Sequence, residues 1–384
     1  MPLALVALFA AAFAIGTTEF VIAGILPAVA ADLHISIPTA GNLVSLYALG
    51  VAVGGPMLAL WTGHYSRKRL LLVYVAIFTA GHVLCALAPS YELLLASRVM
   101  IALVHGAYFG TAMILAASVV PENRRGFAAS LLLAGLTIAN IVGVPLGTAI
   151  GTEFHWRITF WAIGALGVIA GILILLLLPS DRPVAPARGN LRRELNALSR
   201  EPVYSSLAII ILQTVGQFAL FTYISPLLTD VAGIPTNTVP WLLLLFGVGS
   251  TLGVFGGGRL ADWKLMPSLV AIMVVMVIIY LLMAVFSWQP IVLAILVLIW
   301  GALAFGFGAP VQVRILSNAR DAPTLAANLI PSAFNVSIAG GAWFGGTLID
   351  AGFSYAILPW IGAVSAGLAA LVAIASWMKE RRAT

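Results

Sequence analysis

Charged residues are scarce in this sequence. Only 8% of the 384 residues are Asp, Glu, Lys or Arg, while 62% are hydrophobic. Soluble domains carry about 25% charged residues. A chain of this length cannot hide so much apolar surface in a core, because the buried fraction rises only slowly with size. The composition therefore excludes a soluble globular fold and indicates that lipid surrounds most of the chain.

Cysteine and the common catalytic motifs are also missing. The single Cys85 lies in an apolar run, which excludes a disulfide framework. The five histidines do not have the spacing of a metal site. The chain has no H-E-x-x-H motif, no paired intramembrane aspartates and no P-loop. These absences argue against an enzyme, a bound cofactor and an ATP-driven pump.

Long apolar runs, by contrast, are numerous. A helix needs about 20 mostly apolar residues to cross the hydrocarbon core of a membrane. In the first half such segments are Leu3–Ala30, Ala40–Trp61, Leu70–Leu87, Leu93–Val119, Phe127–Ile150 and Ile158–Leu178. In the second half they are Val203–Leu228, Val239–Leu260, Ser268–Phe286, Ile291–Val313, Leu325–Leu348 and Ala356–Trp377. No stretch alternates in polarity as barrel strands do, so we predict an all-α membrane protein with twelve spans.

The chain divides at its longest polar segment. We predict an N-terminal six-helix bundle over 1–178, a cytoplasmic linker over 179–202 and a C-terminal six-helix bundle over 203–384. A shift of the sequence against itself by 199 positions places Gly50 on Gly249 and Gly54 on Gly253. Such a constant offset indicates an internal repeat.

The basic residues indicate the orientation of the spans. Of the 19 Lys and Arg residues, 17 fall in loops or ends on one side of the predicted spans, including Arg314 between spans 10 and 11. That side is expected to be the cytoplasm, and both termini lie on it. The net charge of +6 is thus a sign of membrane topology, and no nucleic-acid partner is expected.

Span 5 carries the glycine-rich stretch "GLTIANIVGVPLGTAIG". Its glycines Gly135, Gly143, Gly147 and Gly151 are spaced 8, 4 and 4 apart, so three of them share one helix face. Small residues at this spacing let another helix approach closely, and Pro145 should bend the span. The motif is explained by close packing alone, or by packing that also controls how the bundle seals. The corresponding stretch in span 11 has the glycines without the proline.

These motifs resemble a known family. The "GVPLG" stretch is similar to the antiporter motif of drug:proton antiporters in the major facilitator superfamily. "GTTEFVIAGILPAVAADL" in span 1 and "RVMIALVHGAYFG" in span 4 resemble its arabinose-efflux-permease-like branch, which includes sugar, nucleoside and chloramphenicol exporters. The resemblance implies two six-helix bundles related by a pseudo-two-fold parallel repeat, with a substrate site near the midplane.

The loop between spans 2 and 3 departs from the family pattern. In "ALWTGHYSRKR", Gly63 stands where the family has an Asp that latches neighbouring helices, although Arg67 and Lys68 remain. The equivalent loop of the second half, "GGRLADWK", retains Asp262. The resemblance therefore implies a latch in the second half and puts the first in doubt.

Two polar residues of span 4 are candidates for proton coupling. Arg98 either snorkels to the membrane surface or, as the family motif implies, faces the cavity, since an intramembrane charge normally has a partner or a cavity. His105 is seven residues on and shares its face. It either relays protons or remains neutral and hydrogen-bonded. We interpret His82 and Cys85 as packing residues.

Seven other polar residues fall inside predicted spans. Each is either a substrate contact or a hydrogen-bonding link between helices: Asn42, Tyr108, Asn140, Gln213, Gln217, Tyr223 and Asn335. In the family, spans 1, 4, 7 and 10 line the cavity, which favours the substrate role for the two glutamines of span 7. Because few charges fall near this cavity, a neutral or amphipathic substrate is expected.

Glu19 is the most unusual residue of span 1. No charged residue precedes it, and the next is Asp32, so Glu19 lies roughly 20 Å below the outer end of the helix. A carboxylate at this depth must be neutralised, paired or hydrated. It is either a structural residue bonded to a neighbouring carbonyl or a proton carrier. Its depth differs from that of Arg98 by about 10 Å, which leaves a direct ion pair open.

The resemblance and Glu19 together predict a secondary transporter. The expected function is proton-coupled export of a sugar-like, nucleoside or chloramphenicol-like molecule, with an importer or a uniporter of the same fold as the alternative. The expected partners are this small molecule, protons and the lipid bilayer, and the energy source is the proton gradient in place of a cofactor. The protein is expected to work as a monomer in a bacterial inner membrane.

Overall fold

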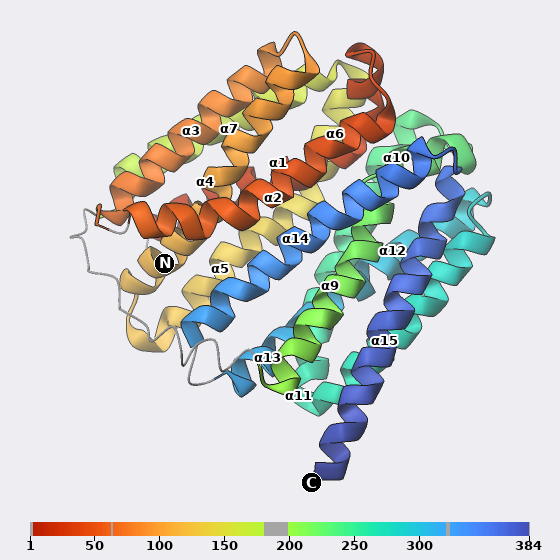
Figure 1. Cartoon of the computed structure of the whole chain (residues 1–384). Helices are drawn as coiled ribbons and strands as arrows, with labels where there is room; N and C mark the ends of the chain where they lie inside the picture. Colours follow the sequence, from red (N-terminus) through yellow and green to blue (C-terminus); the bar gives the residue numbers. More distant parts are fainter. Residues whose placement is uncertain (1–2, 63, 180–198, 320–322, 384) are drawn as a thin grey trace. The chain divides into compact units, whose positions relative to one another are not determined.

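The structure, a computed structural model, describes residues 3–62, 64–179, 199–319 and 323–383 (Figure 1). In these ranges the chain is helical and has no β-strand, which confirms the predicted fold class. The chain forms two compact units, Met1–Ala187 and Arg188–Thr384. Most of the predicted linker lies outside the described residues, as does Gly63 of the predicted first-half loop.

Six membrane-length segments make up the described part of the first unit. They are α1 (Leu3–Asp32), α2 (Ile37–Thr62), α3 (Arg67–Leu87), α4 (Tyr91–Ser118), the composite α5–η2–α6 and α7 (Trp156–Leu177). Short polar side chains begin several of them. Ser66 accepts a hydrogen bond from the Arg69 N–H at the start of α3, and Ser90 accepts one from the Leu93 N–H at the start of α4. Such caps satisfy N–H groups that have no partner within the helix.

The fifth segment contains a π-helical turn. It consists of α5 (Arg125–Ile138), the π-helix η2 (Ala139–Gly143) and α6 (Val144–Glu153), preceded by the short 3-10 helix η1 (Glu122–Arg124). In η2 the Val144 N–H bonds to the Ala139 carbonyl, five residues back. Pro145 follows directly and has no N–H to donate. The sequence predicted a bend at Pro145, and the structure has a π turn with one extra residue immediately before it.

This extra residue changes which glycines share a face. Eight residues of a regular α-helix turn it about 80° past two full turns, which would carry Gly135 away from the other three glycines. The π turn removes most of this rotation. All four glycines consequently face α1: Gly135, Gly143, Gly147 and Gly151. A Cβ atom on Gly143 would lie only 2.0 Å from the Thr17 hydroxyl oxygen, and one on Gly151 would lie 2.6 Å from Ile25. The sequence-based prediction of three glycines on one face was one short.

The second unit contains one helix that is too long for a single span. Its elements are α9 (Glu201–Phe221), α10 (Ile224–Pro226), η3 (Leu227–Val231), η4 (Thr236–Thr238), α11 (Val239–Val285), α12 (Pro290–Gly306), α13 (Gly308–Asn318), α14 (Pro323–Asp350), η5 (Tyr355–Ile357) and α15 (Leu358–Ala383). The 47 residues of α11 would extend about 70 Å, more than twice the core of a membrane. The backbone leaves the helical region at Lys264 (φ −152°, ψ 94°), so α11 provides the predicted spans 8 and 9.

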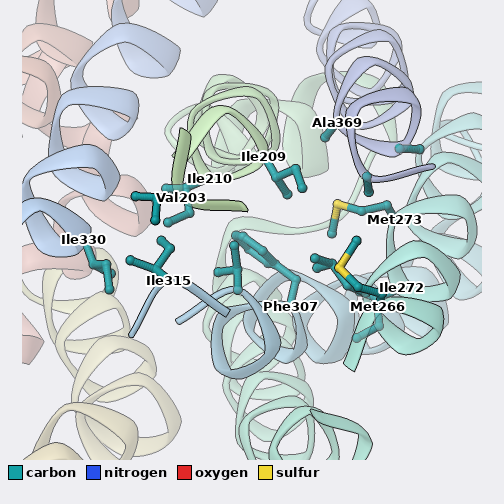
Figure 2. Close-up of a cluster of buried hydrophobic side chains, with 14 of the residues drawn as sticks. Val203, Ile209, Ile210, Met266, Ile272, Met273, Phe307, Ile315, Ile330 and Ala369 are labelled. Atoms are coloured by element: carbon teal, nitrogen blue, oxygen red, sulfur yellow. The ribbon is translucent and has the colours of Figure 1, made fainter. Parts of the chain in front are cut away.

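Ten of the helical segments are long and apolar enough to cross a membrane, with α11 counted once. Counting α11 as two and adding the 28-residue α14 gives the twelve predicted spans in the described part of the chain. The core of the second unit lies where these helices meet (Figure 2). Val203 of α9, Met273 of α11 and Phe307 beside α12 are all buried there.

Corresponding helix pairs in the two units approach closely at glycine. In the first unit a Cβ on Gly54 would lie 2.4 Å from the Leu103 Cα, between α2 and α4. In the second unit a Cβ on Gly253 would lie 2.0 Å from the Ala302 carbonyl oxygen, between α11 and α12. Each residue of the second pair is 199 positions after its counterpart. The repeat seen in the sequence thus corresponds to equivalent packing within each unit.

Candidate functional site

Glu19 faces His105 inside the first unit. The Glu19 side chain, on α1, is 14% exposed, and its Oε2 lies 3.9 Å from Nε2 of His105 on α4. The other ring nitrogen of His105, Nδ1, lies 2.9 Å from the Tyr47 hydroxyl of α2. Tyr47 itself is buried. Three helices therefore contribute one residue each to a short polar row, of which the sequence identified Glu19 and His105 but not Tyr47.

Arg98 is fully buried on α4. Its Nη1 donates to the Thr18 carbonyl at 2.9 Å and to the Thr18 hydroxyl at 3.4 Å, and Nη2 donates to the Leu43 carbonyl at 3.5 Å. The guanidinium carbon lies 4.2 Å from the centre of the Tyr47 ring, which is the geometry of a cation–π contact. Arg98 therefore does not snorkel in this structure. No carboxylate in the described residues lies within ion-pair distance of it, although Thr18 adjoins Glu19.

His82 belongs to the same network. It is fully buried on α3, with Nε2 at 2.8 Å from the Thr18 hydroxyl and Nδ1 at 2.7 Å from the Phe78 carbonyl. The interpretation of His82 as a packing residue was incomplete, because both ring nitrogens have polar partners. Thr18 and Tyr47 had no signal in the sequence beyond being polar residues within apolar spans.

The predicted substrate residues of the first unit differ in their surroundings. The Tyr108 hydroxyl donates to the Leu8 carbonyl at 2.9 Å and thereby links α4 to α1. Asn140 is buried in η2, the π turn. Asn42 is partly buried near the start of α2. For Tyr108 the structure thus provides the helix-linking role that the sequence had left open beside substrate contact.

In the second unit, Gln213 and Gln217 lie on α9 and are both buried. Neither amide atom of Gln213 has a hydrogen bond of normal geometry in the described part of the chain, although the amide lies close to the Tyr280 hydroxyl. Tyr223 instead donates to the Ala342 carbonyl of α14 at 2.9 Å. The Asn335 side-chain N–H donates to the Pro331 carbonyl at 3.0 Å, while its Oδ1 has no partner in this part of the chain. Among the four predicted residues, Gln213 is the one with both side-chain polar atoms fully buried and without a hydrogen bond of normal geometry in the described residues.

Aromatic rings collect near this part of α9. The ring centres of Phe221 and Phe246 are 4.9 Å apart, and those of Phe246 and Trp300 are 4.8 Å apart. The Trp300 indole N–H donates to the Tyr280 hydroxyl at 3.0 Å. Such rings offer faces for stacking, and Trp300 is fully buried.

The predicted conformational residues lie at helix ends and turns. Arg67 begins α3, and Lys68 donates from Nζ to the Leu175 carbonyl at 2.8 Å, near the end of α7. A cation at a helix C-terminus is a favourable placement. Asp262 is exposed, two residues before the break at Lys264, and forms no ion pair with any residue that the structure describes. The latch predicted for Asp262 stays a prediction.

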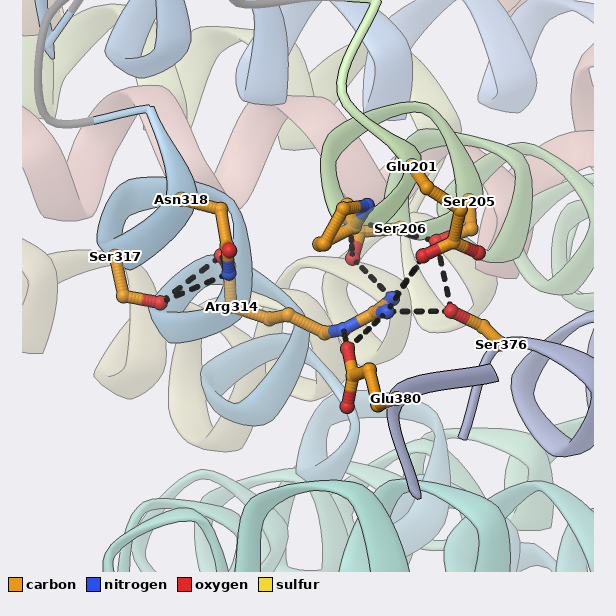
Figure 3. Close-up of polar contacts among 9 residues, drawn as sticks. Glu201, Ser205, Ser206, Arg314, Ser317, Asn318, Ser376 and Glu380 are labelled. Atoms are coloured by element: carbon orange, nitrogen blue, oxygen red, sulfur yellow. Dashed lines mark hydrogen bonds and ion pairs between the residues drawn. The ribbon is translucent and has the colours of Figure 1, made fainter. Parts of the chain in front are cut away.

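A buried ionic cluster in the second unit was not expected. Arg314 lies within α13 and is only 1% exposed, contrary to its assignment to a loop. Figure 3 shows its guanidinium between three helices. It donates to Glu380 of α15 at 2.7 Å and to Glu201 of α9 at 3.4 Å. Three serines complete the cluster: Ser205, Ser206 and Ser376. A charge near a predicted loop gave no indication that it would be enclosed.

Comparison with known proteins agrees with this arrangement. A model described as the Major Facilitator Superfamily matches residues 8–330. The chain belongs to this superfamily. It is 40% identical to the inner membrane transport protein YdhP of Escherichia coli, over 98% of this chain and 96% of that protein. It is 36% identical to a chloramphenicol resistance protein of Streptomyces lividans (89% and 88%) and 32% identical to the putative transporter AraJ of Escherichia coli (89% and 87%).

Solved structures support the fold of this superfamily member. A bacterial homologue of the human lysosomal transporter Spinster, in an inward-facing and occupied conformation, has a TM-score of 0.77 at 16% sequence identity. The match covers 98% of this chain and 96% of that one. The chain is therefore a multi-pass membrane transporter with the major facilitator fold, and not an enzyme.

Proposed function

We propose that this transporter exports a small neutral or amphipathic molecule in exchange for protons, with Glu19 as the proton carrier. The observation that carries the proposal is the environment of Glu19. In the described residues its only ion-pair contact is His105, at 3.9 Å, and a histidine is charged only when protonated. An intramembrane carboxylate must be neutralised, paired or hydrated. Glu19 has no permanent cation as an ion-pair partner, so a proton is the simplest means to neutralise it.

The row Glu19–His105–Tyr47 is suited to follow such a proton. When Glu19 is ionised, a proton on Nε2 of His105 points toward the carboxylate, and Nδ1 accepts from the Tyr47 hydroxyl. When Glu19 is protonated, its O–H can donate to Nε2 once their 3.9 Å separation shortens to hydrogen-bond distance. Nδ1 then carries the ring proton and donates to the Tyr47 oxygen. A phenol can donate or accept, so Tyr47 fits both states. This arrangement holds the His105 ring in the same position when Glu19 is protonated and when it is ionised.

The glycine face of α5–η2–α6 is a surface along which α1 can move. Its glycines contact α1 above and below Glu19, at Thr17 and at Val21. Surfaces without side chains allow two helices to slide with little steric change. We therefore assign Pro145 and these glycines to the change of conformation that exposes Glu19 to one side of the membrane and then to the other.

The aromatic cluster of the second unit is assigned to the substrate. Phe221, Phe246 and Trp300 provide ring faces. Gln213 provides a buried amide beside the Tyr280 hydroxyl that has no hydrogen bond of normal geometry in the described residues. A side-chain amide both donates and accepts hydrogen bonds. The combination suits an uncharged molecule that has a ring and an amide or hydroxyl group. The relative named as a chloramphenicol resistance protein is consistent with a substrate of this kind.

Export across a bacterial inner membrane fits the relatives and the loop charges. YdhP is named as an inner membrane transport protein. Under the positive-inside rule, the basic residues of the loops favour a cytoplasmic location for both termini. We assign the working form as a monomer, with substrate, protons and lipid as its partners.

The test begins with the substrate. Cells that express the protein are compared with cells that do not for resistance to a panel of sugars, nucleosides and chloramphenicol-like compounds. A compound that is exported is then followed in proteoliposomes with an imposed pH gradient. The unaltered protein should concentrate it against its gradient and move protons in the opposite direction. Glu19→Gln should bind it but no longer concentrate it.

The matched control is Glu122→Gln, the same substitution at an 85% exposed carboxylate of the first unit. It should leave transport unchanged. Uphill transport by Glu19→Gln at the original rate would overturn the assignment of Glu19. Protons and substrate that move in the same direction would instead identify an importer, and transport that never exceeds equilibrium would identify a uniporter.

A further inference from the structure

Hydrogen bonding determines the protonation of the buried His82 ring. The Phe78 carbonyl, 2.7 Å from Nδ1, can only accept, so Nδ1 carries a proton. The neutral ring then has Nε2 as an acceptor, and the Thr18 hydroxyl at 2.8 Å donates to it. A hydroxyl has one proton to donate. The oxygen of Thr18 is therefore left to accept, and Arg98 Nη1 lies 3.4 Å away in a position to donate to it.

The same contacts fix the direction of the Arg98 guanidinium. The group is held by the Thr18 carbonyl and hydroxyl on one side, by the Leu43 carbonyl on another and by the Tyr47 ring beneath it. It lies close enough to Glu19 for the two charges to interact, yet it forms no ion pair with that carboxylate in the described structure. The Nε of Arg98 has no partner in the same part of the chain.

We propose that His82 and Thr18 are positioning residues that hold the Arg98 guanidinium away from the Glu19 carboxyl. Released from the Thr18 hydroxyl, the guanidinium could turn to Glu19, one residue further along α1. A bidentate arginine–carboxylate pair is among the strongest polar contacts in proteins and favours the ionised carboxylate. Glu19 would then take up a proton only at lower pH. The importance of this positioning for transport rests on the proposed function, in which Glu19 is the proton carrier. The positioning itself does not, since the proton affinity of Glu19 can be measured without a substrate.

Few other ionisable groups surround Glu19. Tyr47 faces it from α2, His82 and Cys85 lie on α3, and Arg98 and His105 lie on α4. The segment from α5 to α6 contributes glycines on either side of Glu19, at Thr17 and Val21. The charge at the start of α7, Arg157, is bound to Asp32. Arg98 is thus the permanent cation whose position can change the proton affinity of Glu19.

The test is a pH titration of the purified full-length protein in lipid membranes, followed by infrared spectroscopy of protonated carboxyl groups. The Glu19 band is the one that disappears in Glu19→Gln. Thr18→Val keeps the shape and the backbone carbonyl but removes the hydroxyl. It should move the titration midpoint of this band to lower pH by at least about one unit, as a neighbouring arginine does to a carboxyl. His82→Leu should move it in the same direction.

Two further variants make the outcome decisive. Thr18→Ser restores the hydroxyl and should restore the original midpoint. In the double variant Thr18→Val with Arg98→Met, the shift to lower pH should vanish because its cause is the guanidinium. A folded Thr18→Val protein with an unchanged midpoint, or a shift that survives in the double variant, would overturn the proposal. If the shifts occur but Glu19→Gln still transports uphill, the positioning role stands and the proposed function fails.

Discussion

In the described residues, each compact unit contains one arginine that is almost completely buried, and the two are neutralised in different ways. Arg314 of the second unit binds two glutamates and three serines. Arg98 of the first unit binds backbone carbonyls, one hydroxyl and an aromatic face, with no ion pair in the described residues. Burial of a charge is costly unless it is paired. The charge of Arg314 is therefore neutralised by its own glutamates. Arg98 has no such counter-ion in the described residues, so its energy depends on whether a charge appears or disappears nearby.

The repeat makes the contrast sharper. A shift of 199 positions carries four residues of the polar network of the first unit onto apolar residues of the second: Glu19 onto Phe218, Tyr47 onto Phe246, Arg98 onto Val297 and His105 onto Ala304. Thr18 falls on the polar Gln217. The glycine packing between the equivalent helices is retained. Two related bundles thus have equivalent close packing but different chemistry at these four positions, with ionisable groups in one and aromatic or aliphatic side chains in the other.

The largest expected effect on stability comes from Arg314→Ala. It removes the cation that binds both Glu201 and Glu380, which should destabilise the protein by about 2–3 kcal/mol. The effect is smaller than for fully buried carboxylates because both are partly exposed. The melting temperature in detergent is the measurement, and the exposed Arg259→Ala is the control. Lost transport with an unchanged melting temperature would show that Arg314, too, has a functional role, and the contrast with Arg98 would fail.

A pair of exchanges tests the equivalent positions directly. Tyr47→Phe gives the first unit the residue of the second and removes the hydrogen bond to His105. It should slow transport about five-fold, the effect of about 1 kcal/mol. Phe246→Tyr places a hydroxyl among the rings of Phe221 and Trp300 and should destabilise the protein by about 1–3 kcal/mol. Initial transport rates and melting temperatures distinguish the two. Slower transport from both, at equal stability, would argue that the units do not differ in role.

The smallest effect on stability is expected for Pro145→Ala. Alanine supplies the missing N–H, so the helix can close into a regular α-helix in place of the π turn. The melting temperature should change by less than the equivalent of about 1 kcal/mol, while the transport rate falls because the glycine face no longer matches α1. A parallel loss of both would mean that Pro145 serves only the fold. The corresponding segment of α14 in the second unit has no such proline. Slower transport at nearly unchanged stability is therefore expected from this segment of the first unit alone.

The sequence predicted the spans well because their signal is local. Run length alone located the two spans of α11 on either side of Lys264, and a single charge in an apolar run identified Glu19. The hydrogen-bond partners of His105 and Thr18 were harder to find, since Tyr47 and His82 come from other helices. Contacts of this kind depend on how each helix is rotated, and a span that is apolar on all sides carries little information about rotation. Arg314 was placed wrongly because position in the sequence shows nearness to a loop but not enclosure by other helices.

The π turn η2 also predicts where related proteins could lose a residue from this segment. It amounts to one residue inserted into a helix whose two flanks kept their faces aligned. A relative with one residue fewer between 139 and 143 would form a regular α-helix and present the same glycines to the first helix, since seven residues bring a helix back to within about 20° of its starting face. A one-residue deletion between Gly135 and Gly143 should therefore be tolerated, whereas one between Gly143 and Gly151 should not. Sequence alignments of the family should place their gap in this turn, immediately before the proline.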